Sequence, residues 1–93
     1  MFAISFDLVV SDLRRCCGES YNSAYFKIKR SLNSDGFWWI QGSTYVTLSD
    51  DMLNLFVALQ HLNAFEWFRE SVRDIRGFRM ENWSDFTPYF KGE

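Results

Sequence analysis

The first ten residues alternate in the way of a β-strand that has one buried face and one open face. One face is bulky and apolar and suits packing beneath helices: Phe2, Ile4, Phe6 and Leu8. The other face carries Ala3, Ser5 and Asp7. Because an unpaired buried charge is very costly, Asp7 must reach water, a metal ion, a partner chain or a substrate. Asp7 is therefore the first candidate for a functional residue, and an acid that simply faces solvent at a strand end is the alternative.

The length and composition of the chain favour one domain, residues 1–93, that associates with a second copy. A chain of 93 residues has no room for two independent cores. Its residues are 47% hydrophobic and 19% aromatic, which excludes disorder and leaves apolar surface to cover. The N-terminal apolar run is short and is broken by Asp7, so we expect neither a signal peptide nor a membrane span.

The net charge and the two cysteines limit the partners and the cellular compartment that we expect for the protein. A net charge of −2 argues against strong non-specific binding to nucleic acid, although a local basic cluster is present. Cys16 and Cys17 are neighbours, and neighbouring cysteines do not easily form an ordinary disulfide. We therefore expect reduced thiols in a cytoplasmic protein. The sequence leaves the role of this cysteine pair open.

Periodicity and turn signals predict the remaining elements. After a polar connection over residues 11–19, a helix begins at Ser20 and ends at Asp35-Gly36. Residues 37–41 and 43–48 form a hairpin around Gly42. A second helix begins at Ser49 as its N-cap, and Val72 to Met80 form the last strand after a short helical turn. The second helix is expected to leave His61 in solvent and to bury Met52, Leu55, Phe56, Leu59 and Leu62.

The order strand, helix, strand, strand, helix, strand predicts an α+β fold, a ferredoxin-like βαββαβ sandwich. Its four-stranded antiparallel sheet carries two helices on one face. The first strand is central in that topology, so the end that carries Asp7 should lie near Ser43, Tyr45 and Arg73. We expect Ser43, Tyr45 and Thr47 to share the uncovered face with Ser5 and Asp7. The remaining residues, 82–93, form a tail with four aromatic side chains, which suggests a segment that packs on a partner subunit.

Several stretches of the sequence resemble the virulence-associated protein D (VapD) family. They are Phe-Ala-Ile-Ser-Phe-Asp-Leu at residues 2–8, Tyr-Asn-Ser-Ala-Tyr at 21–25, Gly-Phe-Trp-Trp-Ile-Gln-Gly-Ser-Thr-Tyr at 36–45, Trp-Phe-Arg-Glu-Ser-Val-Arg-Asp-Ile-Arg-Gly-Phe at 67–78 and Asn-Trp-Ser-Asp-Phe-Thr at 82–87. The resemblance runs nearly from end to end and in the same order. It implies a ferredoxin-like homodimer, similar to the small CRISPR-associated nucleases, that acts as an endoribonuclease. In some genomes such proteins are toxins beside an antitoxin, and the resemblance implies that Asp7 is the catalytic acid.

The residues themselves leave two chemistries open for cleaving RNA. Two Asp7 carboxylates, brought together at a dimer axis, could hold a Mg²⁺ or Mn²⁺ ion that polarises the phosphate. Alternatively, two close carboxyl groups could work as acid and base without a metal. Ser43 and Tyr45 would orient the substrate or a bound water, or would be ordinary strand residues. Arg73, Arg76 and Arg79 would grip phosphate, or would be surface charges paired with Asp74 and Glu81.

A function of another class fits the same fold, namely a non-catalytic RNA-binding or regulatory dimer. RNA-recognition modules of this topology display aromatic side chains on their two central strands. Here the first strand offers Ala3 and Ser5, and only Tyr45 is aromatic among the residues expected on the open face of the third. The sequence therefore favours an endoribonuclease that cleaves single-stranded RNA such as mRNA, with the binding module as the alternative.

Overall fold

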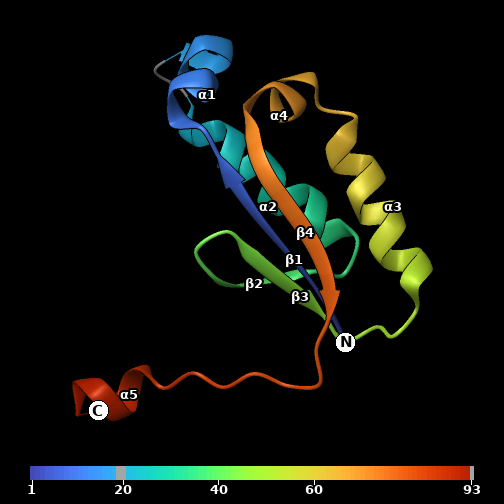
Figure 1. Cartoon of the computed structure of the whole chain (residues 1–93), viewed down its shortest axis with the longest axis vertical. Helices are drawn as coiled ribbons and strands as arrows, with labels where there is room; N and C mark the ends of the chain where they lie inside the picture. Colours follow the sequence, from blue (N-terminus) through green and yellow to red (C-terminus); the bar gives the residue numbers. More distant parts are fainter. Residues whose placement is uncertain (19–20, 93) are drawn as a thin grey trace.

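One antiparallel sheet and five helices make up the part of the chain that the structure, a computed structural model, describes: residues 1–18 and 21–92 (Figure 1). In chain order they are β1 (Phe2–Leu8), α1 (Val10–Cys17), α2 (Asn22–Ser34), β2 (Trp38–Gln41), β3 (Thr44–Thr47), α3 (Met52–Asn63), α4 (Glu66–Ser71), β4 (Val72–Arg79) and α5 (Thr87–Lys91). The strands lie in the order β2-β3-β1-β4, and each neighbouring pair is antiparallel. The predicted ferredoxin-like arrangement is confirmed, with three short helices added to it.

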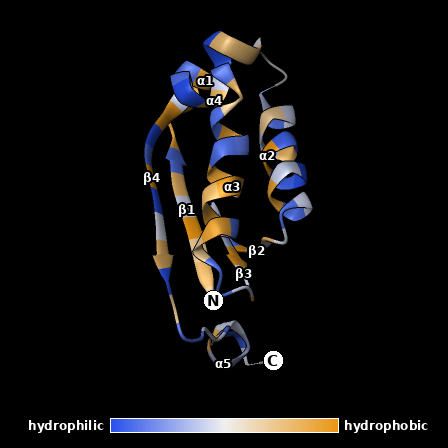
Figure 2. Cartoon of the chain, turned by 90° about the vertical axis from the view of Figure 1, so that its right-hand side faces the viewer, coloured by the Kyte–Doolittle hydropathy of each residue, from blue (hydrophilic) through white to orange (hydrophobic). Residues whose placement is uncertain are grey.

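The core lies between the sheet and the helices α2 and α3, which cover one face only (Figure 2). The alternation of β1 sets this arrangement, because its four bulky apolar residues are all at most 7% exposed. They pack against Ile28 and Leu32 from α2 and against Leu55 and Leu62 from α3. The hairpin turn contains Gly42 at φ 49°, a left-handed conformation that glycine adopts without strain. The opposite face of the sheet is left without helices.

The predicted polar connection is wrong for residues 11–17, which belong to helix α1 together with Val10. Leu13 anchors α1 because its side chain is fully buried. The backbone N–H of Val9 donates to the carbonyl of Ser71 at 2.8 Å, which ties the start of α1 to the end of α4. The N-cap predicted at Ser20 lies outside the described residues. Helix α2 begins at Asn22 and ends as predicted before Asp35 and Gly36.

Two predictions for α3 are wrong. Asp51, and not Ser49, caps the helix, because its carboxylate accepts a hydrogen bond from the N–H of Leu53. Met52 and Phe56 were expected in the core but are 60% and 61% exposed. Ala58 takes the inward position between Leu55 and Leu62, so the buried stripe is narrower and rotated relative to the predicted one. His61 is exposed, as expected.

The chain after β4 leaves the sheet and ends in the short helix α5, which lies outside the sheet and the helix layer (Figure 1). All residues from 81 to 92 are exposed, including Trp83, Phe86, Tyr89 and Phe90. This aromatic tail, residues 81–92, therefore adds nothing to the buried core of its own chain. None of the helices in the described part of the chain has the length and apolar character needed to cross a membrane.

The one-sided core makes a direct prediction for stability. Leu32→Ala should lower the free energy of unfolding by about 2–5 kcal/mol, because it leaves a cavity where a fully buried side chain stood. Leu48→Ala is the matched control, since Leu48 is 84% exposed and its truncation should change stability by less than about 0.5 kcal/mol. Urea unfolding followed by circular dichroism measures both, and equal losses would contradict the assigned core.

Candidate active site

The uncovered face of the sheet carries three rows of side chains that change from apolar to acidic along β1. The strand register places Ala3 beside Val46 and Phe78, then Ser5 beside Thr44 and Arg76, and then Asp7 beside Asp74. Successive residues of a strand point to opposite faces, so these three rows lie on the face away from the core. The hydroxyls of Ser5 and Thr44 are 3.2 Å apart and hydrogen-bonded. The candidate site is the acidic row at the end of this face.

Asp7 is held beside a basic side chain by an irregularity in the sheet. Its carboxylate Oδ2 lies 3.4 Å from a guanidinium nitrogen of Arg73, with both side chains more than half exposed. Between Asp7–Asp74 and Leu8–Val72 the register shifts, so Arg73 is the extra residue of a β-bulge. A bulge re-aims a side chain that would otherwise follow the strict alternation of the strand. The predicted neighbourhood of Asp7 and Arg73 is thus confirmed.

A second carboxylate stands opposite Asp7 within the same chain. Residues that face each other in an antiparallel pair have Cα atoms roughly 4.5–5.5 Å apart. Asp7 and Asp74 are such partners, and both side chains lie on the open face. The Nε–H of Arg76 donates to both carboxylate oxygens of Asp74, at 3.1 and 3.2 Å. The result is two acids flanked by two arginines, all accessible to solvent.

The sequence identified Asp74 only as a partner for a neighbouring arginine. The signal that would have found it is the register of β4 against β1, which depends on where the bulge falls. Because Arg73 is bulged, Asp74 pairs with Asp7 and Val72 pairs with Leu8.

The expected positions of Ser43 and Tyr45 on the open face are wrong. Tyr45 pairs with Ile4 and is 6% exposed, with its ring 6.2 Å from that of Phe6 in a stacked arrangement within the core. Ser43 lies in the turn before β3, where its carbonyl accepts a hydrogen bond from the N–H of Phe6. Thr47 pairs with Phe2 and is also buried. Thr44 and Val46 take the open-face positions instead, because the register is shifted by one residue.

Arg79 does not lie with Asp7 in the same chain. It pairs with Phe2 at the opposite end of β1, and its guanidinium carbon lies 5.1 Å from the centre of the Phe2 ring. Asp7 lies five positions after Phe2 along the strand, a distance of roughly 17 Å. Of the three predicted phosphate-binding arginines, the structure brings Arg73 and Arg76 to the acidic row and leaves Arg79 apart.

Tyr25 of α2 is a site candidate that the sequence did not single out. Burial raises the pKa of its phenol, and the negative charges of Tyr21 and Asp7 raise that pKa further. The phenol is protonated at neutral pH and can donate a hydrogen bond.

The other reactive side chains lie elsewhere. The Nδ1 atom of His61 is 2.8 Å from Oδ2 of Asp35, so the histidine links the ends of α3 and α2. The Cys16 thiol donates to Oε2 of Glu70 at 2.9 Å, and that hydrogen bond raises the pKa of the thiol. This contact joins α1 to α4, so Cys16 has a structural role here, and both cysteines are free thiols.

The acidic row offers only part of a metal site. No group of three or more histidine, cysteine, aspartate or glutamate side chains that could hold a metal occurs among residues 1–18 and 21–92 of one chain. Asp7 and Asp74 nonetheless supply the oxygen ligands that Mg²⁺ and Mn²⁺ prefer. Mg²⁺ commonly binds through one or two carboxylates, with substrate phosphate and water completing its shell. The two acids therefore fit an ion that binds together with the substrate.

The chain is similar to known ribonucleases over nearly its whole length. No family model matches it. Endoribonuclease VapD of Dichelobacter nodosus is 45% identical over 92 residues, which is 99% of each chain. Endoribonuclease VapD homolog of Neisseria gonorrhoeae is 50% identical over 91 residues, covering 98% of this chain and 99% of the relative. Endoribonuclease VapD of Helicobacter pylori is 43% identical over 93 residues, covering 98% and 99%.

The electrostatic link between Asp7 and Tyr25 is testable by titration. Asp7→Asn should lower the pKa of Tyr25, because a negative charge that disfavours the phenolate is removed, while burial keeps that pKa above the ordinary value. Tyr45 is the internal control, since burial alone raises its pKa and the substitution should not move it. Carbon-13 NMR of the tyrosine rings reports both groups.

The same shift gives a pH dependence of stability. The folded-state pKa of Tyr25 lies above the unfolded value of about 10. The contribution of Tyr25 to the free energy of unfolding is therefore fully present below pH 10. The contribution is lost as the pH rises through the folded-state pKa. A Tyr25 pKa that is identical in the parent and in Asp7→Asn would contradict the link.

Proposed function

Because the chain belongs to the VapD family, we propose that it is an endoribonuclease that cleaves single-stranded RNA, including mRNA, at the Asp7–Asp74 row. The observation that carries this proposal is the position of the two acids. They stand opposite each other on a solvent-exposed sheet face, between Arg73 and Arg76. The relatives named endoribonucleases support the reaction class.

The four side chains suit the two requirements of RNA cleavage. A phosphodiester must have its negative charge neutralised, and guanidinium groups do this with two-point hydrogen bonds. Substrate phosphate would replace the carboxylates as a partner of Arg73 and Arg76, which frees Asp7 and Asp74. A freed carboxylate can then accept the proton of the attacking hydroxyl as the new P–O bond forms. The resulting carboxyl group can return this proton to the leaving oxygen as its P–O bond breaks. We propose that the phenol of Tyr25 donates a further hydrogen bond to the phosphate.

The paired acids no longer require a dimer axis to bring them together. With Asp74 in the same chain, one subunit already holds the two oxygen donors that were expected from two copies of Asp7. We propose that Asp7 and Asp74 hold Mg²⁺ or Mn²⁺ with the substrate. Such an ion supplies polarisation of the phosphate and neutralises developing charge. The arginines position the scissile phosphate beside it.

The open face of the sheet has an exposed aromatic side chain that can contact unpaired bases of the substrate. Trp38 pairs with Val46, lies in the apolar row of the same open face and is 59% exposed. An exposed indole can stack on an unstacked base, as aromatic side chains do in proteins that bind single strands. The two central strands offer no aromatic platform on the open face, since their residues there are Ala3, Ser5, Thr44 and Val46. This pattern supports a nuclease over a purely RNA-binding module.

The proposed function includes the compartment, the oligomeric state and the control of the enzyme. We propose a cytoplasmic homodimer, which fits its RNA substrate, its free cysteines and its exposed apolar side chains. The acidic row is open to any RNA, so an antitoxin protein that covers it would control the activity. The proposed role is accordingly that of a bacterial toxin paired with an antitoxin.

Loss of the Asp7 carboxylate should abolish most cleavage without loss of the fold. Asp7→Asn is expected to lower the rate of RNA cleavage by roughly 100-fold or more, because the amide cannot accept the proton. The measurement is the initial rate on a fluorescently labelled single-stranded RNA, with circular dichroism to verify folding. Asp12→Asn is the matched control, since Asp12 forms only a surface pair with Arg15 and its substitution should leave the rate unchanged. A folded Asp7→Asn protein with the parent rate would eliminate the proposal, whereas binding of RNA without turnover in the parent would leave the RNA-binding module.

The metal is tested separately. A chelator should stop cleavage, and added Mg²⁺ or Mn²⁺ should restore it. Asp74→Asn should raise the concentration of Mg²⁺ that gives half-maximal rate by about tenfold or more, because one of two protein oxygen donors is lost. Undiminished turnover in chelator would instead show that the two carboxyl groups act as acid and base alone.

A further inference from the structure

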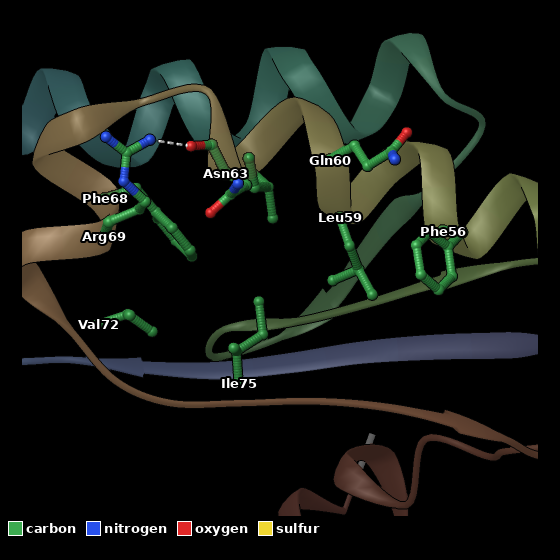
Figure 3. A pocket seen from close by; sticks show the side chains of 9 residues that line it. Phe56, Leu59, Gln60, Asn63, Phe68, Arg69, Val72 and Ile75 are labelled. Atoms are coloured by element: carbon green, nitrogen blue, oxygen red, sulfur yellow. Dashed lines mark hydrogen bonds between the residues drawn. The ribbon is translucent and has the colours of Figure 1, made fainter.

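An apolar pocket lies between α3, α4 and β4, on the helix side of the sheet (Figure 3). Its volume is about 410 Å³, near the lower end of the range of roughly 300–1,000 Å³ for pockets that bind small molecules. The side chains that form its walls are apolar: Phe56, Leu59, Leu62, Phe68, Val72 and Ile75. Polar residues complete the lining: Gln60, Asn63 and Arg69. We use the name α3/β4 pocket for this set of residues.

The α3/β4 pocket is elongated along α3. Its lining residues from this helix run from Phe56 to Asn63, which is seven positions or roughly 10 Å at the helical rise of about 1.5 Å per residue. Figure 3 shows Phe56 at one end of the pocket and Arg69 with Phe68 at the other. Among the described residues that line the pocket, Arg69 alone is charged. A positive charge therefore stands at one end of a long apolar pocket.

The guanidinium of Arg69 has hydrogen-bond donors left for a ligand. Its Nη1 atom donates to the carbonyl of Asn63, the last residue of α3 (Figure 3). This bond satisfies a carbonyl at the helix end and uses only one of the N–H groups of the arginine. Within residues 1–18 and 21–92, Arg69 forms no ion pair. The neighbouring acid Glu70 accepts a hydrogen bond from the Cys16 thiol instead.

We infer that the α3/β4 pocket binds an amphiphilic carboxylate, with the alkyl chain between α3 and β4 and the carboxylate on Arg69. The apolar walls suit hydrocarbon, because each methylene that leaves water improves affinity about fourfold. A guanidinium binds a carboxylate through two parallel hydrogen bonds. Medium-chain fatty acids are the class of ligand with both features. The site is separate from the acidic row, and its occupation does not depend on the cleavage of RNA.

The length of the pocket indicates the length of the ligand. An extended alkyl chain grows by about 1.3 Å per carbon, since its C–C bonds of about 1.5 Å zigzag at the tetrahedral angle. The roughly 10 Å between Phe56 and Asn63 therefore matches a chain of about eight carbons. Octanoate is accordingly the probe that we expect to fit.

The charge of the lining favours a carboxylate over a phosphate. A single guanidinium carries one positive charge, which balances the single negative charge of a carboxylate. A phosphate monoester carries about −1.5 to −2 charges at pH 7. Gln60 and Asn63 contribute only neutral amide groups beside Arg69. A doubly charged head group would therefore be only partly neutralised in this pocket.

Calorimetric titration of the full chain with a series of amphiphiles tests the ligand class. Octanoate should bind about tenfold or more tightly than octan-1-ol, because only the carboxylate gains charge-assisted hydrogen bonds to Arg69. Hexanoate should bind about tenfold more weakly than octanoate, because two methylenes are lost. Octyl phosphate should also bind more weakly. Failure of octanoate to bind, or equal affinities for octanoate and octan-1-ol, would overturn the inference, and tighter binding of octyl phosphate would overturn the carboxylate as the head group.

Arg69→Gln separates the charge from the apolar walls. The substitution should weaken octanoate binding by about tenfold or more and leave octan-1-ol binding unchanged. Arg30→Gln is the matched control, because Arg30 is an exposed arginine of α2 that does not line the pocket. Circular dichroism verifies the fold of both variants. A folded Arg69→Gln protein that binds octanoate as the parent does would contradict the assignment of Arg69.

NMR of the methyl groups locates the ligand without any substitution. Octanoate should shift the methyl signals of Leu59, Val72 and Ile75, which line the pocket. The methyl signals of Leu48 are the internal control and should stay in place, since Leu48 is 84% exposed and lies outside the pocket. Octanoate binding with shifts confined to residues outside the lining would overturn the α3/β4 pocket as the site.

Discussion

The pairing of β1 with β4 is the contact on which both the fold and the candidate site depend. It extends from Phe2–Arg79 to Leu8–Val72 and makes β1 a central strand with neighbours on both sides. The inward residues of β1 then nucleate the core beneath α2 and α3. The outward residues meet those of β4, and the shift between Asp7 and Leu8 allows Asp74 and Arg73 both to reach Asp7. The bulge thus adds Arg73 to the cluster that the regular register forms from Asp7, Asp74 and Arg76.

The two faces of the sheet carry different kinds of side chains. The helix face is occupied by the core and carries an apolar pocket between α3 and β4, whereas the uncovered face carries the acidic row and Trp38. Tyr25 lies on α2, and the charge of Asp7 contributes to raising its pKa.

Errors of one residue explain most differences between the predicted and observed sites. Strand alternation has a period of two, so a shift of one position in β3 moves Tyr45 from the open face to the core and brings Thr44 outward. The same sensitivity hid Asp74, since its partner depends on the bulge. In α3 the sequence contained more apolar residues than one helix face can bury, and periodicity alone did not show that Met52 and Phe56 would remain exposed.

Local patterns of side chains were enough to predict the order of the four strands and the two long helices, the core face of β1, the exposure of Asp7 on that central strand and the resemblance to VapD. The residues that surround Asp7 could be identified only from the folded chain. Register, bulge position and helix rotation arise from packing between segments far apart in the chain, and no local pattern encodes them. For the same reason the apolar pocket between α3, α4 and β4 became visible only when these three elements were brought together.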